Sequence, residues 1–190
     1  MLRVFDFVFS LLGLVCGFPV LLVIYVIGLF DTGSPLFFQE RVGRNQKPFT
    51  LVKFRTMKLD TASVASHLAS SASITKLGGF LRKTKLDELP QLWNVFKGEM
   101  SLVGPRPHML KHTTDYSKLV DDYMIRQFLK PGITGWAQVN GFRGEITNPD
   151  QIKMRVNKDL WYLENWTLFL DIQILFLTVY QVLRGDKNAF

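Results

Sequence analysis

The sequence of 190 residues contains one cysteine and three histidines. Cys16 has no partner for a disulfide within the chain, and its position in an apolar run indicates packing or lipid contact rather than a reactive thiol. His67, His108 and His112 are too few and too scattered to predict a metal site, although the last two share a helical spacing. No internal repeat is visible. These scarcities exclude a disulfide scaffold and a histidine-rich metal centre.

Acidic residues are outnumbered by basic ones, with 16 Asp and Glu against 23 Lys and Arg, which gives a net charge of +7. A basic balance of this size implies an acidic partner such as anionic lipid, a phosphate-containing ligand or nucleic acid. The length suits one domain that is large enough to bury a core. Hydrophobic residues are concentrated at the two ends of the chain.

Charge is also absent from the run between Phe7 and Phe30. These roughly 24 residues make about 36 Å of helix, which is enough to cross a bilayer. The few basic residues before the run and the lack of a small-residue cleavage site argue against a signal peptide. Pro19 removes a helical hydrogen bond and predicts a kink near the middle. The run is either a plain transmembrane anchor or a re-entrant helix that returns to the face it entered.

Basic residues on both flanks of this run fit the re-entrant alternative, in which both ends are cytoplasmic. Arg3 precedes the run, and Arg41, Arg44 and Lys47 follow it.

Short strands are predicted over 36–39 and 49–54, with a hairpin connection between them. Residues 61–73 are rich in Ser and Ala and predict a loop or a weak helix. Residues 76–85 predict a basic amphipathic helix, which either lies on an anionic membrane surface or packs on the core with its basic face in water.

The second half of the chain begins with a predicted polar-faced helix over 115–127, in which Leu119, Val120, Tyr123 and Met124 face inward. Residues 132–144 are turn-rich and predict a loop that carries binding groups. From 161 to 184 the chain is apolar but too interrupted to span a membrane. It predicts an interfacial helix with Trp161, Tyr162 and Trp166 at headgroup depth, or a buried core helix.

Two adjacent carboxylates, Asp87 and Glu88, precede Pro90, which is tolerated only in the first turn of a helix. The sequence predicts Asp87 as the N-cap, Pro90 at the third helical position, and a helix that continues through Phe96. The positive end of a helix stabilises a carboxylate and also suits a phosphate.

Arg106 lies between Pro105 and Pro107, which stiffen the backbone on both sides of it. A guanidinium held in this way can bind phosphate oxygens with two hydrogen bonds. From spacing alone, an N-cap Asp, a solvated Glu and a surface Arg in a turn explain the same residues.

Five strings resemble the bacterial sugar transferases, the monotopic phosphoglycosyl transferases that start glycan assembly on a lipid carrier. They occur in the family's order and cover essentially the whole chain: Lys53-Phe54-Arg55-Thr56-Met57, Phe80-Leu81-Arg82-Lys83-Thr84, Leu86-Asp87-Glu88-Leu89-Pro90-Gln91, Gly98-Glu99-Met100-Ser101-Leu102-Val103-Gly104-Pro105-Arg106-Pro107, and Pro131-Gly132-Ile133-Thr134-Gly135-Trp136-Ala137-Gln138-Val139-Asn140-Gly141.

The resemblance implies a helix-rich α+β fold at the cytoplasmic face of the bacterial inner membrane. Residues 1–30 would form a re-entrant membrane helix, kinked at Pro19, where Phe18 replaces the family's usual Ser. Residues 31–190 would form a cytoplasmic catalytic domain with a small strand pair and interfacial amphipathic helices.

The implied reaction transfers a sugar 1-phosphate from a UDP-sugar to polyprenyl (undecaprenyl) phosphate and releases UMP, as the first membrane step of glycan assembly. Gly141-Phe142-Arg143-Gly144-Glu145 resembles the subset that transfers hexose phosphates. Nucleic acid is not an expected partner. The alternative is a membrane-anchored basic binding or scaffold protein without catalysis, which does not explain adjacent acids beside Pro-Arg-Pro.

The resemblance also implies roles for particular residues. Asp87 would attack the sugar-linked phosphate and form a covalent intermediate, and Glu88 would help to hold Mg2+ or activate the acceptor, so that Asp87 and Glu88 are the expected metal ligands. Lys53 and Arg106 would bind phosphate oxygens, with Arg55 as a further candidate. Asp159 would bind the metal or the nucleotide.

Overall fold

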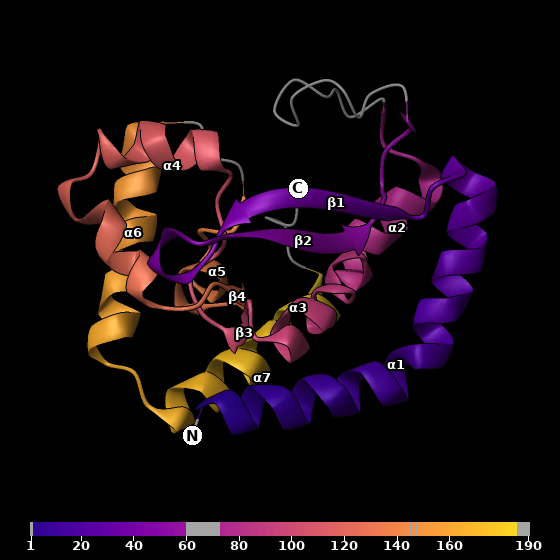
Figure 1. Cartoon of the computed structure of the whole chain (residues 1–190), viewed down its shortest axis with the longest axis horizontal. Helices are drawn as coiled ribbons and strands as arrows, with labels where there is room; N and C mark the ends of the chain where they lie inside the picture. The colour runs from indigo at the N-terminus through magenta and orange to yellow at the C-terminus, as the bar shows by residue number, and fades with distance from the viewer. Residues whose placement is uncertain (1, 60–72, 145, 147, 186–190) are drawn as a thin grey trace.

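The computed structural model describes residues 2–59, 73–144, 146 and 148–185 (Figure 1). The expectation for 61–73 therefore lies outside the described residues, apart from Ser73. The prediction of a helix-rich fold with a small strand pair is confirmed. In chain order the elements are α1 (Leu2–Thr32), β1 (Leu36–Val42), η1 (Arg44–Gln46), β2 (Pro48–Phe54), α2 (Lys76–Thr84), η4 (Leu86–Glu88), α3 (Gln91–Lys97), β3 (Ser101–Val103), α4 (Leu110–Ser117), η5 (Asp121–Phe128), β4 (Gly132–Thr134), α5 (Trp136–Val139), α6 (Pro149–Glu164) and α7 (Leu168–Arg184).

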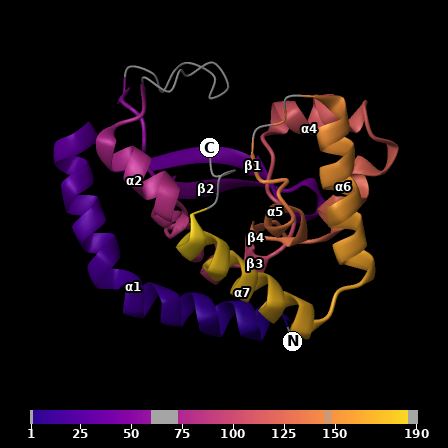
Figure 2. The same cartoon turned by 180° about the vertical axis from the view of Figure 1, so that it is seen from behind.

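Helix α1 contains Pro19 in its interior and is long and apolar enough to cross a membrane by length and composition. Both views show that α1 bends partway along its length (Figures 1 and 2). Its first part packs against α3, and its second part rises beside α2, where Ile24 packs with Phe54 and Leu81. An interior proline accounts for such a bend because it removes one helical hydrogen bond. The re-entrant course through a membrane stays a prediction.

The first part of α1 is fixed to the rest of the chain by a buried carboxylate. The Oδ1 atom of Asp6 accepts hydrogen bonds from the Ser101 hydroxyl at 2.9 Å and from the Leu102 backbone N–H at 3.0 Å. Next to it, the rings of Phe7 and Phe96 stack with their centroids 5.0 Å apart. Since Asp6 lies just before the uncharged run, this attachment holds one end of the apolar helix against β3.

The predicted hairpin is confirmed, with β1 longer than expected. Strands β1 and β2 pair antiparallel from Leu36 opposite Phe54 to Val42 opposite Pro48. Phe49, Leu51 and Phe54 of β2 are buried against the core. The Asn94 amide joins α3 to this hairpin, since its Nδ2 donates to the Thr50 carbonyl at 2.7 Å and its Oδ1 accepts from the Val52 N–H at 3.1 Å.

A second sheet, which the sequence did not predict, lies at the centre of the fold. Strands β3 and β4 pair in parallel, with Ser101 opposite Gly132 and Val103 opposite Thr134. The expectation of a loop throughout 132–144 is therefore wrong for β4 and α5. The two backbone segments approach so closely that a Cβ added at Gly132 would lie 2.1 Å from the backbone nitrogen of Gly104. Glycine at these positions thus reflects close packing rather than a turn.

The predicted single helix over 115–127 is also wrong. Helix α4 ends at Ser117, and the 3-10 helix η5 starts at Asp121. The break arises because Val120 is extended, with φ −137° and ψ 114°. Tyr123 is buried as expected, whereas Leu119 is exposed.

The C-terminal apolar region forms two helices rather than one. The exposed apolar residues Phe169, Phe176 and Leu183 recur along α7, which fits an interfacial helix. Tyr162 of α6 is buried, and its hydroxyl donates to the Asp171 carboxylate at 2.5 Å. Tyr162 therefore faces the protein core, as the alternative of a buried core helix expects.

Candidate active site

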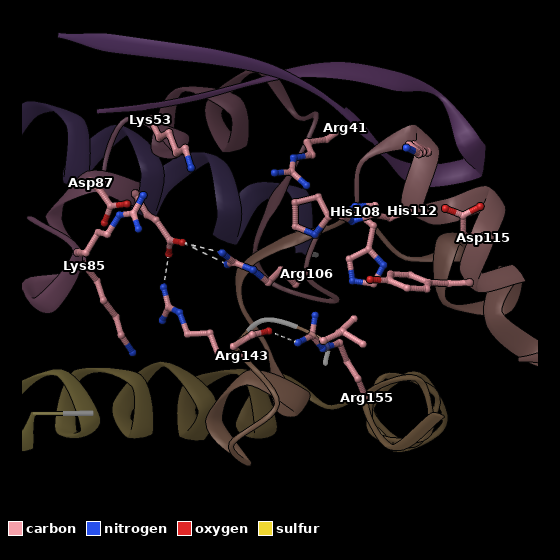
Figure 3. Close-up of a pocket in the computed structure, with 17 residues that line it drawn as sticks. Arg41, Lys53, Lys85, Asp87, Arg106, His108, His112, Asp115, Arg143 and Arg155 are labelled. Atoms are coloured by element: carbon pink, nitrogen blue, oxygen red, sulfur yellow. Dashed lines mark hydrogen bonds and ion pairs between the residues drawn. The ribbon is translucent and has the colours of Figure 1, made fainter. Parts of the chain in front are cut away.

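A cavity of about 640 Å³ opens below the hairpin, between β2, η4, α4 and the segment that follows α5 (Figure 3). Among the described residues, its walls carry three carboxylates, Asp87, Glu88 and Asp115. They are outnumbered by basic side chains, namely Arg41, Lys53, Arg82, Lys85, Arg106, Lys111, Arg143 and Arg155. A concave surface with this excess of positive charge favours an anionic ligand.

The adjacent acids lie on a short 3-10 turn rather than at the cap of a helix. Lys85 ends α2 in the left-handed conformation with φ 60°, and Leu86–Glu88 then forms η4. Helix α3 begins only at Gln91, with Pro90 at its cap, and ends at Lys97. The prediction of Asp87 as N-cap is therefore wrong, because the reversal at Lys85 starts a separate turn. Even so, η4 presents both acids to the cavity.

Glu88 is buried, and both of its carboxylate oxygens are engaged. Nη1 and Nη2 of Arg106 each lie 3.2 Å from Oε1, and Arg143 pairs with Oε2 (Figure 3). Burial acts to raise the pKa of Glu88, but the charges of Arg106, Arg143 and Lys53 outweigh it and lower the pKa to about 2. Glu88 is thus an ionised link between two guanidinium groups.

Asp87 has the opposite environment. Its carboxylate is half-buried and makes no hydrogen bond or ion pair with the residues that the structure describes. Burial and the neighbouring charge of Glu88 raise the pKa of Asp87 to about 6, against the lowering effect of Lys53, Arg106 and Arg143. A carboxylate that is poorly solvated and uncommitted to a partner is a suitable nucleophile.

Lys53 and Arg55 share one side of β2, as the sequence indicated, but only Lys53 lines the cavity. Both cationic groups lie over the ring of Phe37, at 5.3 and 5.4 Å from its centroid. Burial lowers the pKa of Lys53 to about 8, although Asp87 and Glu88 act to raise it. The Arg55 guanidinium instead donates to the carbonyl oxygens of Ser34 and Leu36. The structure therefore brings Lys53 together with the acids and leaves Arg55 outside.

Asp159, which was expected to bind the metal or the nucleotide, also lies outside the cavity wall. It is buried on α6 and paired with Arg126 of η5, whose Nε and Nη2 lie 2.8 and 2.7 Å from Oδ2. The same Nη2 donates to the backbone carbonyl of Arg106 at 2.9 Å. Asp159 thus supports the cavity from behind. Pro19 lies apart from it, within α1.

Several cavity residues were missed or only partly indicated by the sequence. Arg143 belongs to the segment expected to carry binding groups, and Arg82 to the expected basic helix. Arg41 was noted only for its charge beside the apolar run. Arg155 gave no local signal, because a single arginine on a polar helix face resembles any solvated residue.

The fit of a divalent metal depends on the free carboxylate oxygens. Among the described residues no group of three or more His, Cys, Asp or Glu side chains is placed to hold a metal ion. Mg2+, however, is commonly held by one or two carboxylates together with substrate phosphates and water. Asp87 fits that requirement, whereas Glu88 already has both oxygens on arginines.

An uncommitted carboxylate among fixed cations in a cavity is the arrangement of an enzyme site for a phosphate-containing substrate. The family agrees with that class: the model described as "Bacterial sugar transferase" matches residues 1–185, and the chain belongs to this family.

Similar proteins include the UDP-glucose:undecaprenyl-phosphate glucose-1-phosphate transferases of Xanthomonas campestris pv. campestris and Escherichia coli (strain K12). They are 43% and 44% identical over 97% and 94% of this chain, which covers only 39% of each relative. The uncharacterized sugar transferase EpsL of Bacillus subtilis (strain 168) is 43% identical over 97% of the chain and 88% of the relative.

Proposed function

We propose that this chain transfers a sugar 1-phosphate from a UDP-sugar to undecaprenyl phosphate or a related polyprenyl phosphate and releases UMP. The names of the Xanthomonas and Escherichia relatives support the substrates, and they make UDP-glucose the first donor to test. The observation that carries the chemistry is the contrast between the two neighbouring acids. Glu88 is bound by two arginines, whereas Asp87 has no partner within the described residues and lies beside Lys53.

In the first step a carboxylate oxygen of Asp87 attacks the phosphorus atom that bears the sugar. A bond forms between this oxygen and phosphorus, the bond from phosphorus to the bridging oxygen breaks, and UMP leaves with that electron pair. The product is an acyl phosphate that carries the sugar. Lys53 and Arg106 bind the phosphate oxygens on which negative charge increases. The step needs no proton transfer because the nucleophile is already ionised.

In the second step a phosphate oxygen of the polyprenyl phosphate attacks the same phosphorus atom. The bond to Asp87 breaks, the carboxylate is restored, and the polyprenyl-diphosphate sugar leaves. Glu88 holds Arg106 and Arg143 in fixed orientations through both steps, since each arginine is paired with one of its oxygens. We therefore assign Glu88 a positioning role.

Mg2+ is part of the proposal, with Asp87 as the protein ligand that fits it. When bound, the ion would neutralise charge on the diphosphate. The further expectation that Glu88 binds it requires that Arg106 or Arg143 first release a carboxylate oxygen.

Membrane attachment is proposed on the cytoplasmic face of the inner membrane, for the first membrane step of glycan assembly. The apolar surfaces of α1 and α7 support it, since α1 exposes Val4, Phe18 and Phe30, and α7 exposes Phe169. One substrate is soluble and the other has its phosphate at headgroup depth, so a membrane-attached chain can reach both. A basic scaffold protein would need surface cations but not an unpaired acid in a cavity.

The test is UMP release by the purified chain in detergent or nanodiscs with polyprenyl phosphate, Mg2+ and a panel of UDP-sugars. We expect UMP release with at least one donor. With polyprenyl phosphate present each protein molecule should release many molecules of UMP, whereas without it each should release no more than one. A chain that binds anionic vesicles but releases no UMP from any donor would support the scaffold alternative.

A further inference from the structure

Two buried side chains leave donor nitrogens unused in the part of the cavity away from Asp87 (Figure 3). His108 and Arg155 line the cavity, and each is only 6% exposed. Within the described residues, Nε2 of His108 and Nε of Arg155 have no hydrogen-bond partner. A buried donor left unpaired destabilises the fold, because it has lost its hydrogen bonds to water. Donors of this kind in the wall of a cavity therefore point to a ligand.

The proton of His108 is placed on Nε2 by its neighbours. Nδ1 lies 2.6 Å from the Tyr123 hydroxyl and 3.2 Å from Nη1 of Arg126. Because a guanidinium can only donate, Nδ1 must accept, and the neutral ring then carries its proton on Nε2. Burial and the charges of Arg126 and Arg155 hold the pKa of His108 well below its usual value. His108 is thus a neutral donor with a fixed tautomer.

Arg155 contributes a charged donor beside it. Its Nη2 donates to the Gly144 carbonyl at 2.5 Å, which holds the guanidinium in place and leaves Nε unused. Arg41, from the hairpin, also lines the cavity, and its Nε has no partner in the part of the chain that the structure describes. Its Nη2 is held by a hydrogen bond to Gln39 at 2.5 Å. One neutral and two charged donors, each held by another contact, match the oxygens of a phosphate group.

The position of these donors indicates which phosphate they bind. In Figure 3 Asp87 lies at one side of the cavity and His108 at the other, with Arg106 and Arg41 between them. If Asp87 attacks the sugar-linked phosphate, the donors around His108 are placed for the other phosphate of the diphosphate.

The surroundings of His108 suit a nucleoside better than a polyprenyl chain. His112 and Tyr116 of α4 line the cavity, with ring centroids 5.6 Å apart, and aromatic faces are stacking surfaces for a base. Helix α4 also lies far from α1 in both views (Figures 1 and 2). An apolar lipid tail has no reason to enter this polar end of the cavity.

We propose that His108 and Arg155 bind the phosphate that stays with the nucleoside, so that this end of the cavity is the subsite for the departing nucleoside monophosphate. The inference rests on the proposed function. As the bond to the bridging oxygen breaks, charge increases on this phosphate, and the fixed donors stabilise it. They act in the first step and in UMP binding, and not in the attack by the lipid phosphate.

The test is equilibrium binding of UMP to the full chain in detergent, measured by calorimetry for the wild type, His108→Phe and His108→Gln. His108→Phe keeps a ring against Tyr123 but has no donor, and we expect it to weaken UMP binding at least tenfold. His108→Gln restores an N–H near the position of Nε2 and should recover part of that loss. Uridine, which lacks the phosphate, is the control ligand, and its affinity should change by less than twofold.

A second variant and a second substrate keep the result decisive. Arg155→Lys keeps the charge but removes Nε, and it should also weaken UMP binding. It replaces His108→Phe as the test if that variant proves unstable on heating. The KM for polyprenyl phosphate, measured with preformed intermediate, should stay within twofold in both. If the wild type releases UMP but the variants bind UMP as tightly as the wild type does, this inference alone is overturned. A rise in the acceptor KM without loss of UMP affinity would assign the subsite to the lipid phosphate. A wild type that neither binds UMP nor releases it would overturn both proposals.

Discussion

Arg126 and Asp159 form a buried ion pair directly behind the cavity, with two guanidinium nitrogens within 2.8 Å of one carboxylate oxygen. Arg126 also donates to the backbone carbonyl of Arg106 and to Nδ1 of His108. One pair from η5 and α6 therefore sets the position of two residues of the cavity. Asp159 is thus connected to the cavity through Arg126.

The first prediction concerns the stability of this pair. Asp159→Ala leaves Arg126 buried and unpaired, and removing one partner of a buried pair costs about 3–5 kcal/mol. For a chain of this size we expect Tm to fall by about 10 °C. Thermal unfolding in detergent measures it. Lys97→Ala, which removes the more exposed pair with Glu99 at 2.9 Å, is the control and should cost less than about 1 kcal/mol. Equal losses in the two variants would contradict the role given to Arg126.

The second prediction concerns the pH dependence of the first step, measured as formation of the covalent adduct without acceptor. Asp87 must be ionised, and its pKa of about 6 predicts a rate that rises as the pH increases through 6. Lys53 must be protonated, and its pKa of about 8 predicts a rate that falls above pH 8. Omitting the acceptor removes the titration of its phosphate from the profile.

Lys53→Arg is the matched variant for this profile. A guanidinium stays protonated, so the fall above pH 8 should disappear even if the maximum rate is lower. In Lys53→Ala the rising limb should move to higher pH, because the charge of Lys53 lowers the pKa of Asp87. A profile that is unchanged in both variants would exclude Lys53 from the step.

The outline of the fold could be predicted from sequence where local signals decide. Two short strand-like runs with a connection between them predicted the hairpin, and the basic amphipathic pattern predicted α2, which the structure has at Lys76–Thr84. The adjacent acids and Pro-Arg-Pro identified Asp87, Glu88 and Arg106 as members of one site, and the structure places all three at one cavity.

The remaining features depend on contacts between distant segments. Strands β3 and β4 have three residues each, too few for a pattern, and they pair across about 30 positions of sequence. Arg143 follows α5 and Arg155 lies on α6, and only the tertiary fold brings both to the cavity. The burial of Asp159 and its pairing with Arg126 could not be predicted, because a buried carboxylate and an exposed one look alike in the sequence until the partner is known.

The third prediction concerns Arg106 and Arg55, the two arginines that the resemblance associates with phosphate binding. Arg106→Lys keeps the charge but cannot bind Glu88 and a phosphate with two parallel hydrogen bonds, so we expect kcat to fall at least tenfold. Arg106 is partly exposed, so Tm should change by only a few degrees. Arg55→Lys is the control. Its guanidinium donates to backbone carbonyls and lies over the Phe37 ring, outside the cavity, so kcat should stay within twofold. The reverse ranking would restore Arg55 as the phosphate ligand.

The fourth prediction concerns the course of α1. Val4 and Phe30 are exposed near its two ends, so cysteines placed there in a Cys16→Ser background report the side of the membrane on which each end lies. With a re-entrant helix, neither cysteine reacts with an impermeant reagent added outside intact cells, and both react after lysis. Pro19→Leu restores the helical hydrogen bond and should favour a straight helix, with one end labelled from outside. Labelling of one end in the Cys16→Ser background with Pro19 intact would instead show an ordinary span.

The central claim is that Asp87 carries the sugar phosphate, and the mass of the intact protein after incubation with donor and no acceptor tests it most directly. Asp87→Asn removes the nucleophilic oxygen with little change in volume, and Glu88→Gln removes a charge that positions Arg106 and Arg143. We expect a sugar-phosphate adduct on the wild type that maps to Asp87 by peptide sequencing, slower adduct formation on Glu88→Gln, and none on Asp87→Asn. Sustained turnover by Asp87→Asn, with no adduct on the wild type, would show direct transfer between the two substrates and contradict the account.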